Sequence, residues 1–112
     1  MKLADYQKLG LGQFTNLYHE WYCVPERPYH NVAHATDVAD KCFLLSGPEI
    51  NPSTILAALY HDAVYISGSD VNEKSSALAL KHDARMLDMN GLKVDFDMVR
   101  QACLLITQTT IK

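Results

Sequence analysis

The sequence predicts an all-α protein, a single helical bundle of about five helices. Apolar residues recur at spacings of three and four along most of the chain, which is typical of amphipathic helices. Capping residues, glycines and prolines separate these segments. No segment shows the alternation of apolar and polar residues that indicates a β-strand, and the chain contains no internal repeat or low-complexity tract.

The first half of the chain predicts two helices joined by a loop. The first expected helix covers residues 13–22, where aromatic and apolar residues repeat at helical spacing. Two prolines within residues 23–28 predict a connecting loop, because proline restricts the backbone and lacks an amide hydrogen. Asn31 can cap the second helix, which is expected to run to about Leu45.

The third expected helix is the most apolar part of the chain. It begins at Asn51–Pro52, a capping residue followed by proline in the first turn. Residues 55–66 are apolar on every face except at His61 and Asp62. A helix that is apolar all round is a buried helix, so this segment is expected at the centre of the fold.

The second half of the chain predicts two more helices. Asp70 and Glu73 form a capping box for a fourth helix that reaches Met89. Asn90–Gly91 is a C-capping pair that ends it. The fifth helix is expected over residues 96–109, after a cap at Asp95.

Length and composition place the chain among single globular domains. It has 112 residues and 12.6 kDa, with 48% hydrophobic and 21% charged residues, which suits one folded core over residues 1–112. A net charge of −3 without a basic cluster argues against binding a nucleic-acid duplex, and no apolar run is long enough to span a membrane. The cysteines form no Cys-x-x-Cys pair, which predicts reduced thiols packed as small core residues in a cytoplasmic protein: Cys23, Cys42 and Cys103.

Polar residues at the centre of an apolar helix are the main sign of chemistry. Burying His61 and Asp62 costs several kcal/mol unless each gains a strong partner. That partner is supplied by mutual hydrogen bonding, by a link to Arg or Lys, or by a metal ion. His30 and His34 lie four residues apart, on one face of the preceding helix if that helix includes His30. Antiparallel packing of the two helices would place His34, His61 and Asp62 around one divalent cation, because imidazole and carboxylate together suit Zn, Mn, Fe and similar ions.

Two stretches resemble the metal site of the HD superfamily of phosphohydrolases, residues 29–38 and residues 59–62. The first is similar to a signature of cyclic nucleotide phosphodiesterases. Residues 61–65, with Asn72-Glu73 and Ser76-Ala77, are more similar to a group of small bacterial and phage HD proteins described as predicted metal-dependent phosphohydrolases. We favour this group, because the phosphodiesterase motif has a further His where this chain has Ile66.

The resemblance implies a role for each of five residues. His34, His61 and Asp62 would be ligands of a divalent metal ion, which could be Mn, Fe, Zn, Mg, Co or Ni. His30 would donate a proton to the leaving group. Glu73 would contact substrate, although its capping role is sufficient to explain it. The implied reaction is hydrolysis of a nucleotide or another small phosphate ester by a metal-activated water.

The sequence departs from the superfamily in its ligand set. HD proteins add a second Asp on a later helix, and four aspartates of this chain fall too early to match it and are expected on helix surfaces or as caps: Asp83, Asp88, Asp95 and Asp97. The chain is therefore expected to be the N-terminal portion of such an enzyme, with weak or no activity by itself. The alternative is a catalytically silent binding or interaction module that keeps the helical scaffold.

Overall fold

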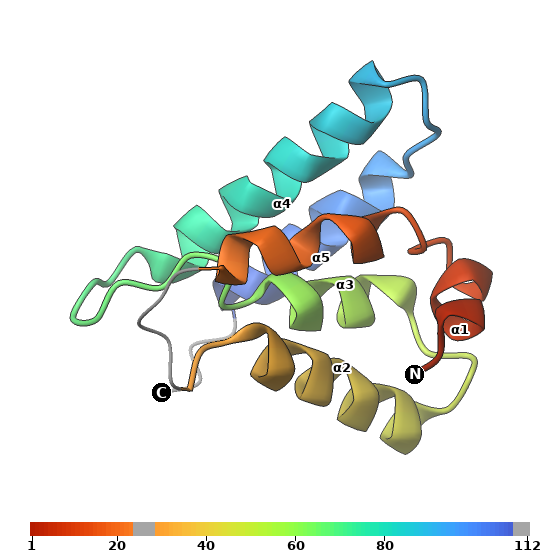
Figure 1. The fold of residues 1–112 in the computed structure, drawn as a ribbon, viewed down its shortest axis with the longest axis horizontal. Helices are drawn as coiled ribbons and strands as arrows, with labels where there is room; N and C mark the ends of the chain where they lie inside the picture. Colours follow the sequence, from red (N-terminus) through yellow and green to blue (C-terminus); the bar gives the residue numbers. More distant parts are fainter. Residues whose placement is uncertain (24–28, 109–112) are drawn as a thin grey trace.

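The computed structural model describes residues 1–23 and 29–108, and within these ranges it contains helices and no β-strand (Figure 1). The predicted all-α class is confirmed. The predicted loop at 24–28 and the predicted helix end at Thr109 lie outside the described residues. In chain order the elements are α1 (Leu3–Lys8), the 3-10 helices η1 (Phe14–Asn16) and η2 (Tyr18–Tyr22), then α2 (Val32–Ser46), α3 (Pro52–Tyr60), α4 (Asn72–Met89) and α5 (Phe96–Gln108).

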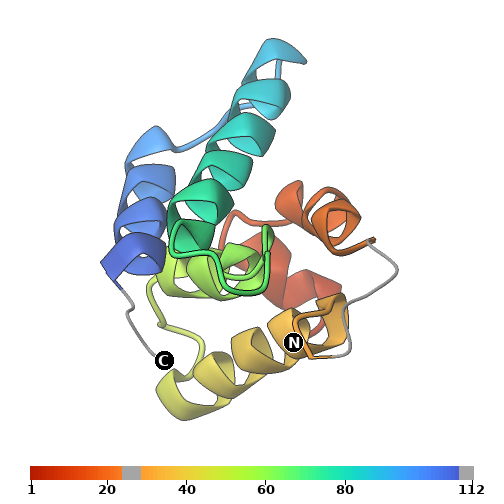
Figure 2. The ribbon, with the colours of Figure 1, turned by 90° about the vertical axis from the view of Figure 1, so that its left-hand side faces the viewer.

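Helix α3 occupies the centre of the fold. It lies between α2 on one side and the pair α4 and α5 on the other (Figure 2). Every residue from Ile55 to Tyr60 is at most 8% exposed, which confirms the predicted buried helix. Burial of one large aliphatic side chain stabilises a fold by about 1.5–3 kcal/mol, so this short helix contributes a large share of the core.

Most of the predicted helix ends are confirmed. The side chains of Asn31, Asn51 and Asp95 each accept hydrogen bonds from backbone N–H groups two or three residues later, at 2.9–3.2 Å. These bonds satisfy donors that have no partner within the helix. The predicted C-cap at Asn90–Gly91 is also present, with a φ of 81° at Gly91 that glycine adopts without steric cost.

The predicted first helix, residues 13–22, is wrong. The structure has the two short 3-10 helices there, and a separate helix α1 that the sequence pattern did not indicate. Phe14, Tyr18 and Tyr22 are buried, and their rings form edge-on or tilted contacts with one another or with Tyr60. A tight 3-10 turn brings these rings onto the core, and tertiary packing of this kind overrides the helical periodicity of a short segment.

The third helix is shorter than predicted. It ends at Tyr60, and His61 is its C-cap. The predicted capping box of Asp70 and Glu73 is also wrong, because α4 begins later, at Asn72, with Val71 as an N-cap that makes no side-chain bond.

Side chains of α4 hold the segment that follows α3. The Asn72 amide accepts from the backbone N–H of Ile66 and donates to its carbonyl, at 3.0 and 2.9 Å. Ser76 does the same for Val64, at 3.0 and 3.1 Å. These bonds satisfy backbone groups that a continued helix would have satisfied internally, so they hold the chain at Val64 and Ile66 in the loop that follows α3.

The expectations for the cysteines and for Asp83 need correction. Cys103 is buried and Cys42 is partly buried as expected, but Cys23 is exposed. Asp83 does not lie on the helix surface, since it is only 6% exposed. Its carboxylate accepts hydrogen bonds from the hydroxyl of Tyr60 and, at 2.9 Å, from Nε1 of Trp21.

The Asp83 carboxylate thus joins η2, α3 and α4. Burial, together with the hydrogen bond to Asp83, raises the pKa of Tyr60, so its hydroxyl remains a donor. Within the described ranges, no helix is long and apolar enough to cross a membrane.

Replacing Asp83 by alanine should lower the free energy of unfolding by about 2–4 kcal/mol, because two buried donors lose their acceptor. Urea unfolding followed by circular dichroism measures this change. Asp88→Ala is the matched control, since Asp88 is an exposed carboxylate on the same helix and its loss should change stability by less than about 0.5 kcal/mol. Equal unfolding midpoints for the two variants would contradict the role assigned to Asp83.

Candidate metal centre

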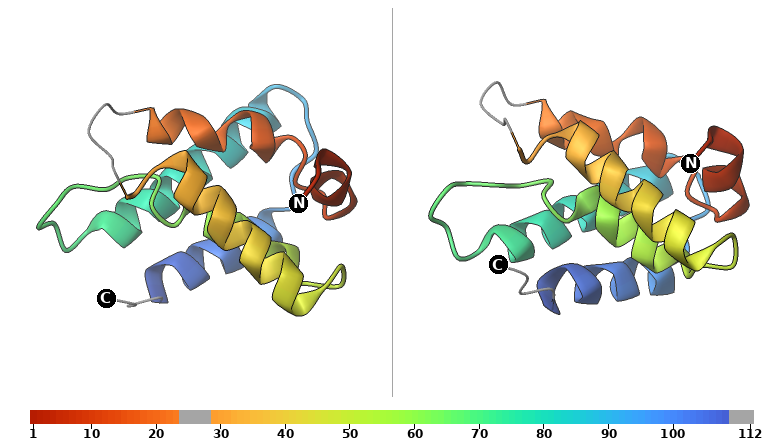
Figure 3. Two further views of the ribbon diagram at one scale, coloured as in Figure 1. Left: turned by 60° about the horizontal axis from the view of Figure 1, so that its bottom comes forward. Right: turned by 90° about the horizontal axis from the view of Figure 1, so that it is seen from below.

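The direction of two helices brings the site residues together. Helices α2 and α3 are joined by a short connection and run in opposite directions, so the start of α2 lies beside the end of α3 (Figure 3). His34 is in the first turn of α2, and His61 and Asp62 follow directly after α3. The predicted antiparallel packing is confirmed.

Three side chains form a group that can hold a metal ion. His34, His61 and Asp62 each offer one ligand atom, and these atoms lie within 4.8 Å of one another. Nε2 of His61 is 3.2 Å and Nε2 of His34 is 3.8 Å from the same carboxylate oxygen of Asp62, Oδ2. His34 is exposed, whereas the other two residues are partly buried. The group is therefore open to solvent on the α2 side.

A backbone contact orients the His61 ring. Its Nδ1 lies 2.7 Å from the carbonyl oxygen of Ala58, and because a carbonyl only accepts, Nδ1 carries the hydrogen. In a neutral ring Nε2 then has a lone pair, which faces the carboxylate of Asp62. Metal-bound histidines are commonly held in this way, with the second ring nitrogen donating to a carbonyl or carboxylate.

The pKa shifts of His61 and Asp62 show that the cluster favours a positive charge beside the Asp62 carboxylate. Burial opposes the charged form of His61, but hydrogen bonds to Asp62 and to the Ala58 carbonyl outweigh it and raise the pKa. Burial likewise opposes ionisation of Asp62, but hydrogen bonds from His61 and His30 lower its pKa to about 2. An ionised carboxylate facing two imidazole nitrogens is a donor set that fits a divalent transition-metal ion.

His30 joins the group from outside the helix. Because α2 begins at Val32, His30 precedes the helix and its Asn31 cap, so the condition for a shared helix face with His34 is not met. Its Nδ1 nevertheless donates to Oδ2 of Asp62 at 2.8 Å. On the other side, the His30 ring stacks on Tyr65, with ring centroids 3.7 Å apart and planes at 18°. The structure therefore brings together all four residues of the two His motifs.

Glu73 is not part of this group. It is partly buried in the first turn of α4, and it is absent from the three-residue cluster among the described residues. Asn72 and Ser76, two other positions of the resemblance, hold the loop after Asp62 through the bonds described above. Tyr65, which is 37% exposed, stacks on His30 and forms a wall of the site. The stacking of Tyr65 on His30 was not predicted, and the only sign of it in the sequence is an aromatic residue three positions after Asp62.

Comparisons of the chain with family models, with curated proteins and with solved structures found no match. The function is therefore inferred from the arrangement of the site residues and from the sequence motifs.

The cluster predicts stoichiometric metal binding that depends on His61. Protein reconstituted with Mn, Fe, Zn, Co or Ni and then desalted should retain metal by elemental analysis. His61→Ala should weaken binding by at least about 100-fold, because it removes one of the three ligands. His82→Ala is the control, since His82 is an exposed histidine on α4. Wild-type protein that retains no metal after all five treatments would rule out the site.

Proposed function

We propose that the chain is a metal-dependent phosphohydrolase of the HD type, acting on a nucleotide or another small phosphate ester. The convergence of His34, His61 and Asp62 beside His30 is the observation that carries the proposal. The resemblance of residues 29–38 and 59–62 to HD motifs supports the same reaction class.

His34, His61 and Asp62 would hold the metal ion, with Mn, Fe, Zn, Mg, Co and Ni as candidates. When bound, such an ion lowers the pKa of a coordinated water from about 15.7 toward about 7 and offsets phosphate charge. The carboxylate of Asp62 is ionised at neutral pH, because its pKa is about 2. Three protein ligands leave coordination positions for water and substrate, as in catalytic rather than structural metal sites.

His30 is the proposed proton donor to the leaving group. Asp62 holds its Nδ1, and Tyr65 covers one face of the ring. These two contacts fix the ring, so the nitrogen that transfers a proton is Nε2. A positioned imidazole contributes about 10²- to 10⁴-fold to a rate by such a transfer.

A catalytically silent binding or interaction module is the second candidate. The lack of a fourth ligand favours it, since the cluster has three protein ligands in the part of the chain that the structure describes. The resemblance implies a further Asp in active HD enzymes, and fewer ligands hold and position an ion less firmly. Weak turnover of this chain is therefore expected under the enzyme proposal, and metal binding without turnover under the alternative.

The enzyme proposal predicts metal-dependent hydrolysis of nucleoside monophosphates or of p-nitrophenyl phosphate. Phosphate release should require added metal, stop on addition of a chelator, and be lost in His61→Ala but kept in His82→Ala. Protein that binds stoichiometric metal yet hydrolyses none of these esters would favour the silent module instead.

Replacing His30 by glutamine separates proton transfer from metal binding. In an extended, active form of the protein, His30→Gln should leave the metal content unchanged and lower turnover of an alkyl phosphate by about 10²- to 10⁴-fold. The loss should be smaller on p-nitrophenyl phosphate, because a stable leaving anion needs little protonation. Equal losses on both substrates, or loss of the metal, would assign His30 to coordination or to structure.

A further inference from the structure

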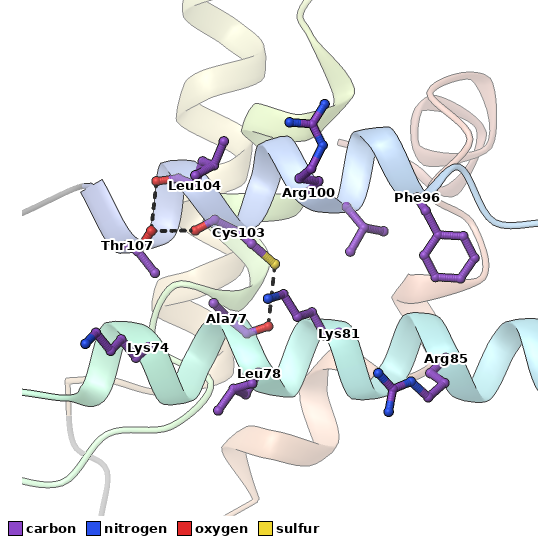
Figure 4. Close-up of a pocket in the computed structure, with 11 residues that line it drawn as sticks. Lys74, Ala77, Leu78, Lys81, Arg85, Phe96, Arg100, Cys103, Leu104 and Thr107 are labelled. Atoms are coloured by element: carbon purple, nitrogen blue, oxygen red, sulfur yellow. Dashed lines mark hydrogen bonds between the residues drawn. The ribbon is translucent and has the colours of Figure 1, made fainter.

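A groove runs along the seam between α4 and α5. The two helices lie side by side in opposite directions, and the groove between them has a volume of about 630 Å³ (Figure 4). Its lining comes from these two helices alone and includes none of the residues of the metal centre. It is thus a separate surface of the molecule.

The groove is apolar along its length. Leu78, Phe96 and Leu104 line it and are 62%, 49% and 46% exposed, while Val99 and Cys103 lie buried at its base. Large apolar side chains that gather on one exposed surface mark an interaction site more often than isolated ones do. Packing of a partner here would remove these three side chains from water.

The same groove carries a concentration of positive charge. Lys74, Lys81, Arg85 and Arg100 line it, four of the ten Lys and Arg residues in a chain of net charge −3, and no acidic residue is among the lining residues. In the described part of the chain, the first three form no ion pair. Arg100 is 3.5 Å from Asp97 in an exposed pair, which contributes little and leaves the guanidinium available.

The shape of the groove favours a helix over a small molecule. Small-molecule sites enclose most of the ligand surface, whereas this groove is open, as the exposure of its leucines shows. From Lys74 to Arg85 it follows about 16 Å of helix, or three turns. An amphipathic helix laid along such a groove places residues i, i+3, i+4 and i+7 on the apolar base.

We propose that the α4–α5 groove docks an acidic amphipathic helix of a partner protein. The apolar stripe of that helix packs on Leu78, Phe96 and Leu104. Its flanking Asp and Glu side chains meet Lys81 and Arg85 on one side and Arg100 on the other. Charge complementarity favours a negatively charged partner, because the lining of the groove has basic side chains and no acidic ones.

The probe is a fluorescein-labelled helical peptide of about 18 residues, long enough to span the groove. It has leucine at positions i, i+3, i+4 and i+7 of a repeating pattern and glutamate on both flanks. A second peptide has the same composition with the leucines shuffled off the stripe. Fluorescence anisotropy should show saturable binding of the patterned peptide to the whole chain, at least tenfold tighter than binding of the shuffled one.

Two double variants locate the site. Lys81→Glu with Arg85→Glu should weaken binding at least tenfold, as should Leu78→Ser with Leu104→Ser. Lys2→Glu with Lys8→Glu is the matched control, because it makes the same change in net charge on exposed residues of the α1 region and should change binding less than twofold.

Three results would overturn the proposal. They are equal binding of the two peptides, equal loss in the control variant, and absence of saturable binding. Sedimentation velocity tests a further outcome, self-association of the chain. If the chain self-associates and the Lys81→Glu and Arg85→Glu pair abolishes this, the occupant of the groove is a second copy of the chain and not a partner helix.

Discussion

The burial of α3 is the constraint on which the rest of the structure depends. A nine-residue helix whose residues from Ile55 to Tyr60 are all buried must be covered on every side, and α2, α4 and α5 provide that cover. The polar pair His61 and Asp62 comes where the chain leaves this covered region. The candidate metal centre is therefore at the end of the core helix, where rigid packing and access to solvent coincide.

Polar side chains from distant segments fix the edges of this core. Asp83 receives hydrogen bonds from Tyr60 and Trp21, so one carboxylate joins three elements. Asn72 and Ser76 hold the loop after Asp62 by bonding its backbone. The bonds to Asp83 satisfy polar groups inside the core, and those from Asn72 and Ser76 hold the loop that begins at His61.

The two proposed functional surfaces use different physics. At the candidate metal centre, three imidazoles approach one carboxylate oxygen of Asp62, and two of them, those of His34 and His61, form with it a donor set that could hold a cation. In the α4–α5 groove, four cationic side chains are spread along an apolar seam, which suits an extended acidic partner. Because the two surfaces share no lining residue, catalysis and docking can be tested by separate substitutions.

The amino-acid sequence alone determined the helical class, the caps at Asn31, Asn51 and Asp95, and the buried character of residues 55–60. These features depend on local spacing and on short-range backbone bonds, which a sequence displays directly. The pairing of His34 with His61 and Asp62 was also predictable, because two helices joined by a short connection pack antiparallel.

Only the tertiary structure decided where α3 ends, how residues 13–22 fold, and how His30 reaches the site. The apolar run continues to Ile66, yet α3 stops at Tyr60, and bonds from Asn72 and Ser76 hold the chain that follows. His30 meets Asp62 from outside any helix. Each of these outcomes depends on partners far away in the sequence, and hydrophobic periodicity carries no information about such partners.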